Sequence, residues 1–368
     1  MNSREKPGRS HFGYGIAAAT LLYVIFAIRP VQQSLWLEPI APILLPDGNY
    51  TSQQKPNSRK DDIRAFANSR TFGYYTDSGE VTYIASIHQA AAIDEGHILE
   101  MDDETGTILL SDAANMSSKK IPIAGYPYMT GDRLFILRPD QQAATEIDNE
   151  GRLLWSQEFG TLITNSSISG NVSAWGLLDG SIKLVGESGT IVSELRPEDY
   201  SVASGYPCIY SVAISHGGAS IAAVYGLEDQ YFLVFAKNGG TYELAYSKKL
   251  AQPIKSSSAA AFSGDGSCAI VRTAEGLVFY DVRKKEGKII RNRYFGGNAA
   301  SLKILPIGAD TFAILLAKGR ERFAGMLKRG AVEAFFPVAQ DTAGMFFHDN
   351  ILALSNSKSI VRYRVKEK

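Results

Sequence analysis

Short apolar runs alternate with polar turns along nearly the whole chain after Arg70. The stretch from Ala261 to Gly287, AFSGDGSCAIVRTAEGLVFYDVRKKEG, reads as strand, tight turn, strand, turn, strand and turn. No long segment shows the 3.6-residue period of an amphipathic helix. Inner runs such as GLVFYDV and FAILLA are apolar at nearly every position, which is typical of strands buried on both faces. The pattern therefore predicts an all-β domain.

Six hairpins share a glycine at or near the turn, and their spacing predicts a structural repeat. Tight hairpins need a residue at positive φ, which glycine adopts without strain. Successive glycines lie about 45 residues apart, which is the length of a four-stranded blade in a β-propeller. The six glycines are Gly106, Gly151, Gly189, Gly239, Gly287 and Gly330.

The last unit ends in the run SIVRYRV and has no fourth strand after it. The segment Thr71–Asp77, TFGYYTD, precedes the first unit, and we expect it to supply the missing strand. Closure would remove two sheet edges that otherwise invite aggregation. Six blades would leave one aligned unit over, and eight would need a repeat that the pattern does not reveal. The sequence thus predicts a seven-bladed β-propeller over residues 71–368, closed by an N-terminal strand.

An uncharged stretch at residues 12–28 predicts one transmembrane helix that serves as a signal anchor. Cationic residues precede it at Arg4, Lys6 and Arg9, whereas only Arg29 follows it within twenty residues. The positive-inside rule then places residues 1–11 in the cytoplasm and the propeller outside it, in the periplasm of a bacterium. A cleaved signal peptide and a buried soluble helix are the alternatives.

Residues 29–70 are mostly polar in their second half and contain too few apolar side chains for a core. We therefore expect them to form a juxtamembrane tether between the anchor and the propeller. Together these features predict a single-pass protein of the cell membrane.

The composition excludes several classes of function. Lys and Arg number 38, and so do Asp and Glu, so no overall field attracts nucleic acid. Cys208 and Cys268 are too far apart for a C-x-x-C pair; one bridge between them is open, and two buried free thiols are favoured. No H-E-x-x-H, P-loop or G-x-S-x-G motif occurs. We therefore predict no catalytic residue, no metal and no cofactor.

Two units resemble known repeat families. The stretch from Ala261 is similar to a WD repeat, with Tyr280-Asp281 in place of Trp-Asp. EIDNEGRLLWSQEFG resembles a quinoprotein-type repeat, in which a glycine turn and a tryptophan dock one blade on the next; here these are Gly151 and Trp155. The resemblances imply a binding platform, and membrane-tethered quinoprotein-like propellers often scaffold envelope assemblies.

The motif Gly-Tyr-Pro occurs twice, each time directly before an innermost strand. Its tyrosines are expected at the mouth of the channel, on the face that carries the loops between blades, where they suit protein recognition. The alternative is that Tyr-Pro only shapes the loop. Asn165 and Asn298 stand out among small residues where innermost strands begin. The candidate partner-binding residues are therefore Tyr126, Tyr206, Asn165 and Asn298.

These observations predict a membrane-tethered, outward-facing propeller that scaffolds another protein in a bacterial envelope. The alternative is a propeller enzyme of the lactonase or quinone-dependent dehydrogenase kind. Such an enzyme needs acids, His or Asn clustered where the innermost strands begin, and those places hold mostly Ser, Thr, Ala and Gly. Trp175 is the candidate to stack on a quinone, and its place in a strand favours core packing instead.

Overall fold

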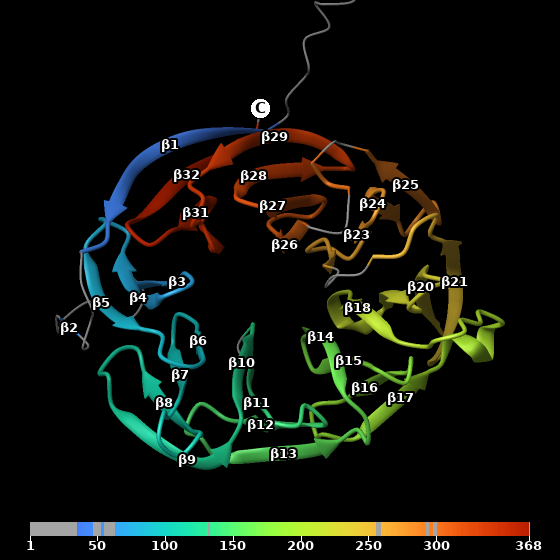
Figure 1. The fold of residues 1–368 in the computed structure, drawn as a ribbon, viewed down its shortest axis with the longest axis horizontal. Helices are drawn as coiled ribbons and strands as arrows, with labels where there is room; N and C mark the ends of the chain where they lie inside the picture. The colour runs from blue at the N-terminus through green and yellow to red at the C-terminus, as the bar shows by residue number, and fades with distance from the viewer. Residues whose placement is uncertain are drawn as a thin grey trace, which may run out of the picture.

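The computed structural model describes residues 35–46, 53–54, 63–131, 133–254, 259–291, 294–296 and 300–367 (Figure 1). Eight four-stranded antiparallel sheets, the blades, form a ring with their innermost strands toward the centre. In blades 2 to 7 the chain runs from the innermost strand to the outermost and then enters the next blade. The described residues also include two short 3-10 helices, η2 (Pro197–Tyr200) and η3 (His216–Gly218).

Blades 2 to 4 follow in chain order, each from its innermost to its outermost strand. Blade 2 contains β6 (Ala91–Ile93), β7 (His97–Met101), β8 (Thr107–Asp112) and β9 (Ser118–Ala124); blade 3 contains β10 (Tyr126–Thr130), β11 (Arg133–Leu137), β12 (Ala143–Ile147) and β13 (Leu153–Glu158); blade 4 contains β14 (Ile163–Ser169), β15 (Val172–Leu177), β16 (Ile182–Val185) and β17 (Ile191–Leu195).

Blades 5 to 7 repeat the same order. Blade 5 contains β18 (Ile209–Ile214), β19 (Ser220–Tyr225), β20 (Tyr231–Asn238) and β21 (Thr241–Lys249); blade 6 contains β22 (Ala260–Phe262), β23 (Cys268–Thr273), β24 (Gly276–Asp281) and β25 (Glu286–Ile290); blade 7 contains β26 (Ala300–Pro306), β27 (Thr311–Lys318), β28 (Glu321–Lys328) and β29 (Ala331–Val338).

Blades 8 and 1 are completed by the N-terminal part of the chain. Blade 8 contains β30 (Gly344–His348), β31 (Ile351–Ser355) and β32 (Ser359–Glu367), and its outermost strand is β1 (Leu35–Leu44). Blade 1 contains β3 (Ile63–Ala67), β4 (Thr71–Thr76) and β5 (Val81–Ser86), and its outermost strand is β2 (Gln53–Gln54). In Figure 1 the blue β1 lies along the red β32, where the two ends of the domain meet.

The predicted seven blades and the predicted closing strand are both wrong. An N-terminal strand does close the ring, but it is β1, because Leu35 to Leu44 pair with β32. Thr71–Asp77 instead contributes β4, a strand inside blade 1. Residues 29–70, the predicted tether, contain β1 and β3. The buried part of that segment is short and interrupted by polar residues, which concealed the eighth blade.

The described part of the chain contains no helix long and apolar enough to cross a membrane. Residues 12–28, where we predicted the transmembrane helix, lie outside that part, as do residues 1–11. The fold class is therefore corrected to an all-β, eight-bladed propeller, with no transmembrane helix among the described residues.

The innermost strand of blade 1 runs in the opposite direction to the innermost strands of the other blades. Three consecutive strands, not four, precede β6, so β3 is antiparallel to the other innermost strands. Its contacts with blade 8 agree: Arg64 near the start of β3 pairs with Asp349, which follows β30. After the end of β3, Asn68 Nδ2 donates to the carbonyl of Asn356 at 3.0 Å. This reversal brings Arg64 to the face where the other innermost strands end.

Hairpin glycines dock blades 3, 4 and 7 on the blade that precedes each of them. A Cβ on Gly189, at φ +80°, would lie 2.5 Å from Trp155 of blade 3. Gly151 meets Ile121 of blade 2 in the same way, and Gly330 meets Phe279 of blade 6. The missing side chain thus makes room for a large apolar group of the neighbour. The docking role that the quinoprotein resemblance implied for Gly151 and Trp155 is confirmed.

Two of the six glycines differ from their predicted place. Gly106 belongs to the turn between β7 and β8, the second and third strands of blade 2, rather than to the last hairpin of a blade. In blade 6 the positive φ falls on Lys285, and Gly287 lies within β25, against the ring of Tyr246.

Both cysteines are free, as the sequence favoured. Cys268 is buried in β23, and Cys208 is half-buried just before β18. Burial raises the pKa of both thiols, so they behave as small apolar side chains rather than as nucleophiles.

Candidate functional site

A cavity of about 490 Å³ opens at one end of the ring, where the innermost strands of several blades meet. It lies on the face formed by the turns that follow the innermost strands of blades 2 to 8, which we call the A–B face. Its lining comes from blades 1, 2, 3, 7 and 8, so it belongs to the ring and not to one blade. The lining residues are Arg64, Ala65, Tyr75, Asp77, Ile93, Asp94, Glu95, Met129, Thr130, Gly131, Leu305, Met345, Phe346, Phe347, His348, Asp349, Ile351, Ala353 and Arg362.

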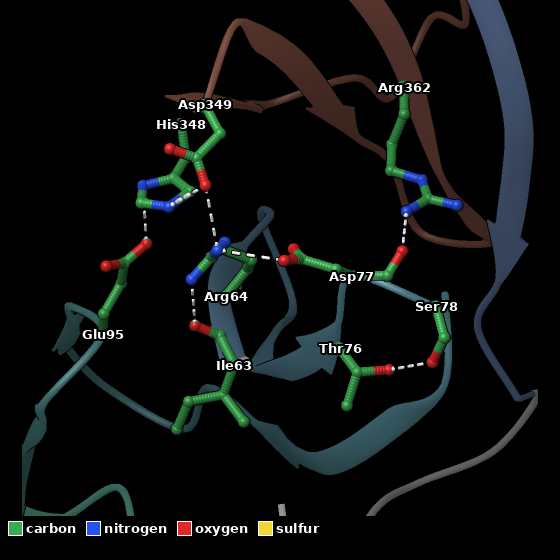
Figure 2. Close-up of polar contacts among 9 residues, drawn as sticks. All are labelled: Ile63, Arg64, Thr76, Asp77, Ser78, Glu95, His348, Asp349 and Arg362. Atoms are coloured by element: carbon green, nitrogen blue, oxygen red, sulfur yellow. Dashed lines mark hydrogen bonds and ion pairs between the residues drawn. The ribbon is translucent and has the colours of Figure 1, made fainter. Parts of the chain in front are cut away.

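Arg64 stands at the centre of the charged part of the lining (Figure 2). Its Nη2 lies 3.0 Å from Asp77 Oδ2 and 3.2 Å from Asp349 Oδ2, and its Nη1 donates to the carbonyl of Ile63. The guanidinium is almost buried, whereas both carboxylates are exposed. The pair with Asp77 lies within blade 1, whereas the pair with Asp349 joins blade 1 to blade 8, and the second pair is possible because blade 1 is reversed.

His348 links blades 8 and 2 across the rim of the cavity (Figure 2). Its Nδ1 lies 3.4 Å from Glu95 Oε1, and its Nε2 lies 2.8 Å from Asp349 Oδ2. Asp349 and Asn350 form the turn between β30 and β31 with φ of +46° and +60°. Asp and Asn adopt this left-handed conformation more readily than other residues with a side chain, which suits them to a two-residue hairpin turn.

The deeper polar groups of the cavity wall are fixed by the backbone. Arg362, on β32, donates from Nη1 to the carbonyl of Asp77 at 3.0 Å and from Nη2 to the carbonyl of Ala41 at 3.2 Å. Its buried Nε has no hydrogen-bond partner. Burial raises the pKa of Tyr75 to about 12, so its phenol stays protonated and adds no charge.

The cavity therefore combines a charged rim with an apolar wall. Its lining contains four carboxylates against two guanidinium groups, and its apolar part includes Ile93, Met129, Leu305, Met345 and Phe347. Sequence reasoning missed these residues: it singled out neither His348 nor Asp349, and it placed Arg64 in the tether. The reversed direction of blade 1 and the partners of Arg64 can be recognised only in the folded structure.

The predicted partner-binding tyrosines lie on the opposite face. Tyr126 begins β10 and Tyr206 lies in the loop before β18, and both side chains are exposed. Their surroundings differ, since a Cβ on Gly125 would lie 2.3 Å from the carbonyl oxygen of Leu137, whereas Gly205 faces open space. A shared role in binding stays a prediction.

The two asparagines fare differently. Asn165 lies on β14, and its Oδ1 accepts the N–H of Val212 on β18 at 2.9 Å. This bond joins the innermost strands of blades 4 and 5. A partner that bound Asn165 would therefore compete with a hydrogen bond that holds the fold together. Asn298 lies outside the described residues.

The outer strands of blades 3 and 4 carry a concentrated apolar patch. Of the eleven large apolar side chains that are exposed in the described chain, seven come from these two blades. Four occupy matching positions, two and three residues after the hairpin glycine, and are 40–59% exposed. We define this rim patch as Leu153 and Leu154 on β13 with Ile191 and Val192 on β17. The other three are Tyr126, Leu162 and Leu178.

A β-bulge in each outer strand explains the exposure of the rim patch. The pairing of β12 with β13 skips Leu154, and the pairing of β16 with β17 skips Val192. A bulge turns two consecutive side chains away from the sheet interior. After Gly330 in blade 7 the equivalent residues are Val332 and Glu333, so the doubled apolar pair is not a general property of the repeat.

The remaining chemical candidates are structural. Trp175 is completely buried, donates to Ser173 Oγ at 2.8 Å and packs against Phe135 and Phe159. Among the described residues no group of three or more His, Cys, Asp or Glu side chains could hold a metal ion.

Comparison with known proteins adds the family. A family model described as a beta-propeller protein matches residues 7–321. An uncharacterized protein of Treponema pallidum (strain Nichols) is 22% identical over 295 residues, which cover 79% of this chain and 77% of that protein.

Solved structures with a similar fold include BamB from Moraxella catarrhalis, with a TM-score of 0.58 and 14% identity; 89% of this chain and 100% of that chain are covered. The computationally designed Ika8 protein has a TM-score of 0.58 and 14% identity, and 86% of this chain and 98% of that chain are covered. A chain of the Mitotic Checkpoint Complex has a TM-score of 0.50 and 9% identity, and 74% of this chain and 88% of that chain are covered. At these identities the likeness shows the fold alone.

Proposed function

The chain belongs to a family of beta-propeller proteins, and from that premise we propose that it is a scaffold that binds another protein through the rim patch of blades 3 and 4. The observation that carries the proposal is the pair of exposed apolar side chains that recurs on the outer strands of two neighbouring blades. Large exposed apolar side chains that gather on one part of a protein's surface mark interaction sites. The presence of a similar fold in the Mitotic Checkpoint Complex is consistent with such a role.

The geometry of the rim patch suits an extended partner segment. β13 and β17 are the last strands of their sheets, so each leaves one row of backbone N–H and C=O groups with no other described strand beside it. An added strand can satisfy such an edge while its side chains meet the exposed apolar pair. The bulges beside the patch limit pairing to the part of each strand that lies beyond them.

Replacing Leu154 and Val192 together by Gln should weaken binding of the partner by about thirtyfold, because a central apolar contact contributes roughly 2 kcal/mol. The partner is first identified by a photo-crosslinking residue at position 154 in the source cells and is then purified. Titration of wild type and variant with the purified partner gives the change. Leu44→Gln is the matched control, since Leu44 is exposed on the outer strand of blade 8. If the double variant binds as tightly as Leu44→Gln, the rim patch is not the binding surface.

We also propose that the protein works outside the cytoplasm, on the basis of the charges that flank residues 12–28. A reporter that is active only outside the cytoplasm, fused after Lys368, should be active. Activity from a cytoplasmic reporter alone would contradict this location.

A further inference from the structure

We propose that the cavity on the A–B face binds a lysine or arginine side chain that a protein partner presents in an extended segment. The proposal rests on the proposed function only in assuming a polypeptide partner. The cavity and the rim patch share no residue, so each can be tested without the other.

The charge of the lining favours a cation. Four carboxylates face two guanidinium groups, and Arg64 already lies within 3.2 Å of both Asp77 and Asp349. Asp94 and Glu95, on the turn of blade 2, add further negative charge. Within the described lining, neither of them pairs with an arginine. The rim should therefore attract a cationic group and repel an anionic one.

The apolar wall favours a long side chain over a bare ion. Ile93, Met129 and Leu305 come from three blades and converge on the same cavity, together with Met345 and Phe347 of β30. Lysine and arginine bury their methylene stems against apolar surface while the charged end stays in a polar environment. A volume of about 490 Å³ lies within the usual range of ligand pockets, so such a side chain fits.

The acidic rim is held in place before any ligand arrives. Asp94 Oδ1 accepts the backbone N–H groups of Gly96 and His97 at 2.7 and 2.6 Å, which fixes the turn that carries Glu95. Glu95 is further held by His348, and Asp349 by both Arg64 and His348. A site whose charged groups are already ordered loses less entropy when it binds.

The test uses three blocked pentapeptides that differ at one position. The probe Ac-Gly-Ser-Lys-Leu-Gly-amide is compared with peptides that carry norleucine or glutamate in place of lysine, and binding to the full chain is followed by calorimetry. The lysine peptide should bind roughly fivefold more tightly than the norleucine peptide, and salt should reduce the difference. Equal binding of these two peptides, preference for the glutamate peptide, or no binding at all would overturn the proposal.

Matched variants locate the effect. Glu95→Gln and Asp94→Asn keep the size of each side chain and the acceptor of the turn, and each should remove most of the preference for lysine. Glu228→Gln is the control, because Glu228 is exposed in the turn between β19 and β20 on the opposite face. Unfolding curves for all three variants should coincide with that of the wild type. If Glu228→Gln changes the preference as much as Glu95→Gln does, the cavity is not the site.

Two further outcomes separate this proposal from others. If neutralising Arg4, Lys6 and Arg9 strengthens peptide binding, the occupant is the chain's own basic segment, and the assignment to a partner is overturned. The double variant Leu154→Gln with Val192→Gln should keep the preference for the lysine peptide. That result supports the cavity proposal even if the double variant still binds the partner, which would contradict the rim patch as the binding surface. Conversely, loss of partner binding by those substitutions without any lysine preference overturns the cavity alone.

Discussion

Replacing Ile43 by Ala should lower the free energy of unfolding by about 2–4 kcal/mol, which a urea titration measures as an earlier midpoint. Ile43 is buried on β1 and packs with Phe66, Ile84 and Ile360, so it joins the closing strand to blades 1 and 8. The shortened side chain would leave a cavity at the point where the ring closes.

Leu44 provides the matched control on the same strand. Its side chain is 76% exposed, whereas that of Ile43 is 4% exposed, so Leu44→Ala should change the unfolding free energy by less than about 0.5 kcal/mol. Deleting residues 1–46 should have a larger effect than either, because it exposes the edge of β32 and should promote association in light scattering. If the two alanine variants unfold alike, β1 does not close the ring in solution.

The repeat itself could be predicted from the sequence, because the turn glycines and the apolar strands are local signals. A glycine such as Gly189 marks a hairpin, and the run before it marks the strand that the hairpin ends. The number of blades could not be predicted in the same way. β3 is five residues long and β2 is two, and both precede the regular units, so they leave no repeat of normal length.

The cavity could not be predicted, because its contacts join residues that are distant in sequence. Arg64 and Asp349 are 285 positions apart, and their meeting depends on the reversed direction of blade 1. A polar turn such as His348-Asp349 looks the same in sequence whether it faces solvent or a channel. The rim patch did leave a signal, since Leu153-Leu154 and Ile191-Val192 follow equivalent glycines. Such doubled apolar pairs at bulged outer strands are a feature to seek in other propeller repeats.

Replacing Gly189 by Ala should destabilise the protein by about 3 kcal/mol or more. The substitution has two penalties: φ of +80° disfavours any side chain, and the new Cβ would lie 2.5 Å from Cβ and Cγ of Trp155. Trp155 is buried and lies 6.0 Å, ring to ring, from Phe135, so it cannot move aside without disturbing the core of blade 3. Thermal and urea unfolding both measure the loss.

Gly170→Ala separates the two penalties. Gly170 has φ of +55°, and a Cβ there would meet nothing within 4 Å, so this variant should show only the backbone penalty of roughly 1–2 kcal/mol. Trp155→Ala should itself lower stability by about 3–5 kcal/mol through the cavity it leaves. Combined with Gly189→Ala it should lose less than the sum of the two, because the new methyl group enters the space of the removed indole. Full additivity, or equal losses for Gly189→Ala and Gly170→Ala, would mean that the tryptophan does not dock blade 4 on blade 3.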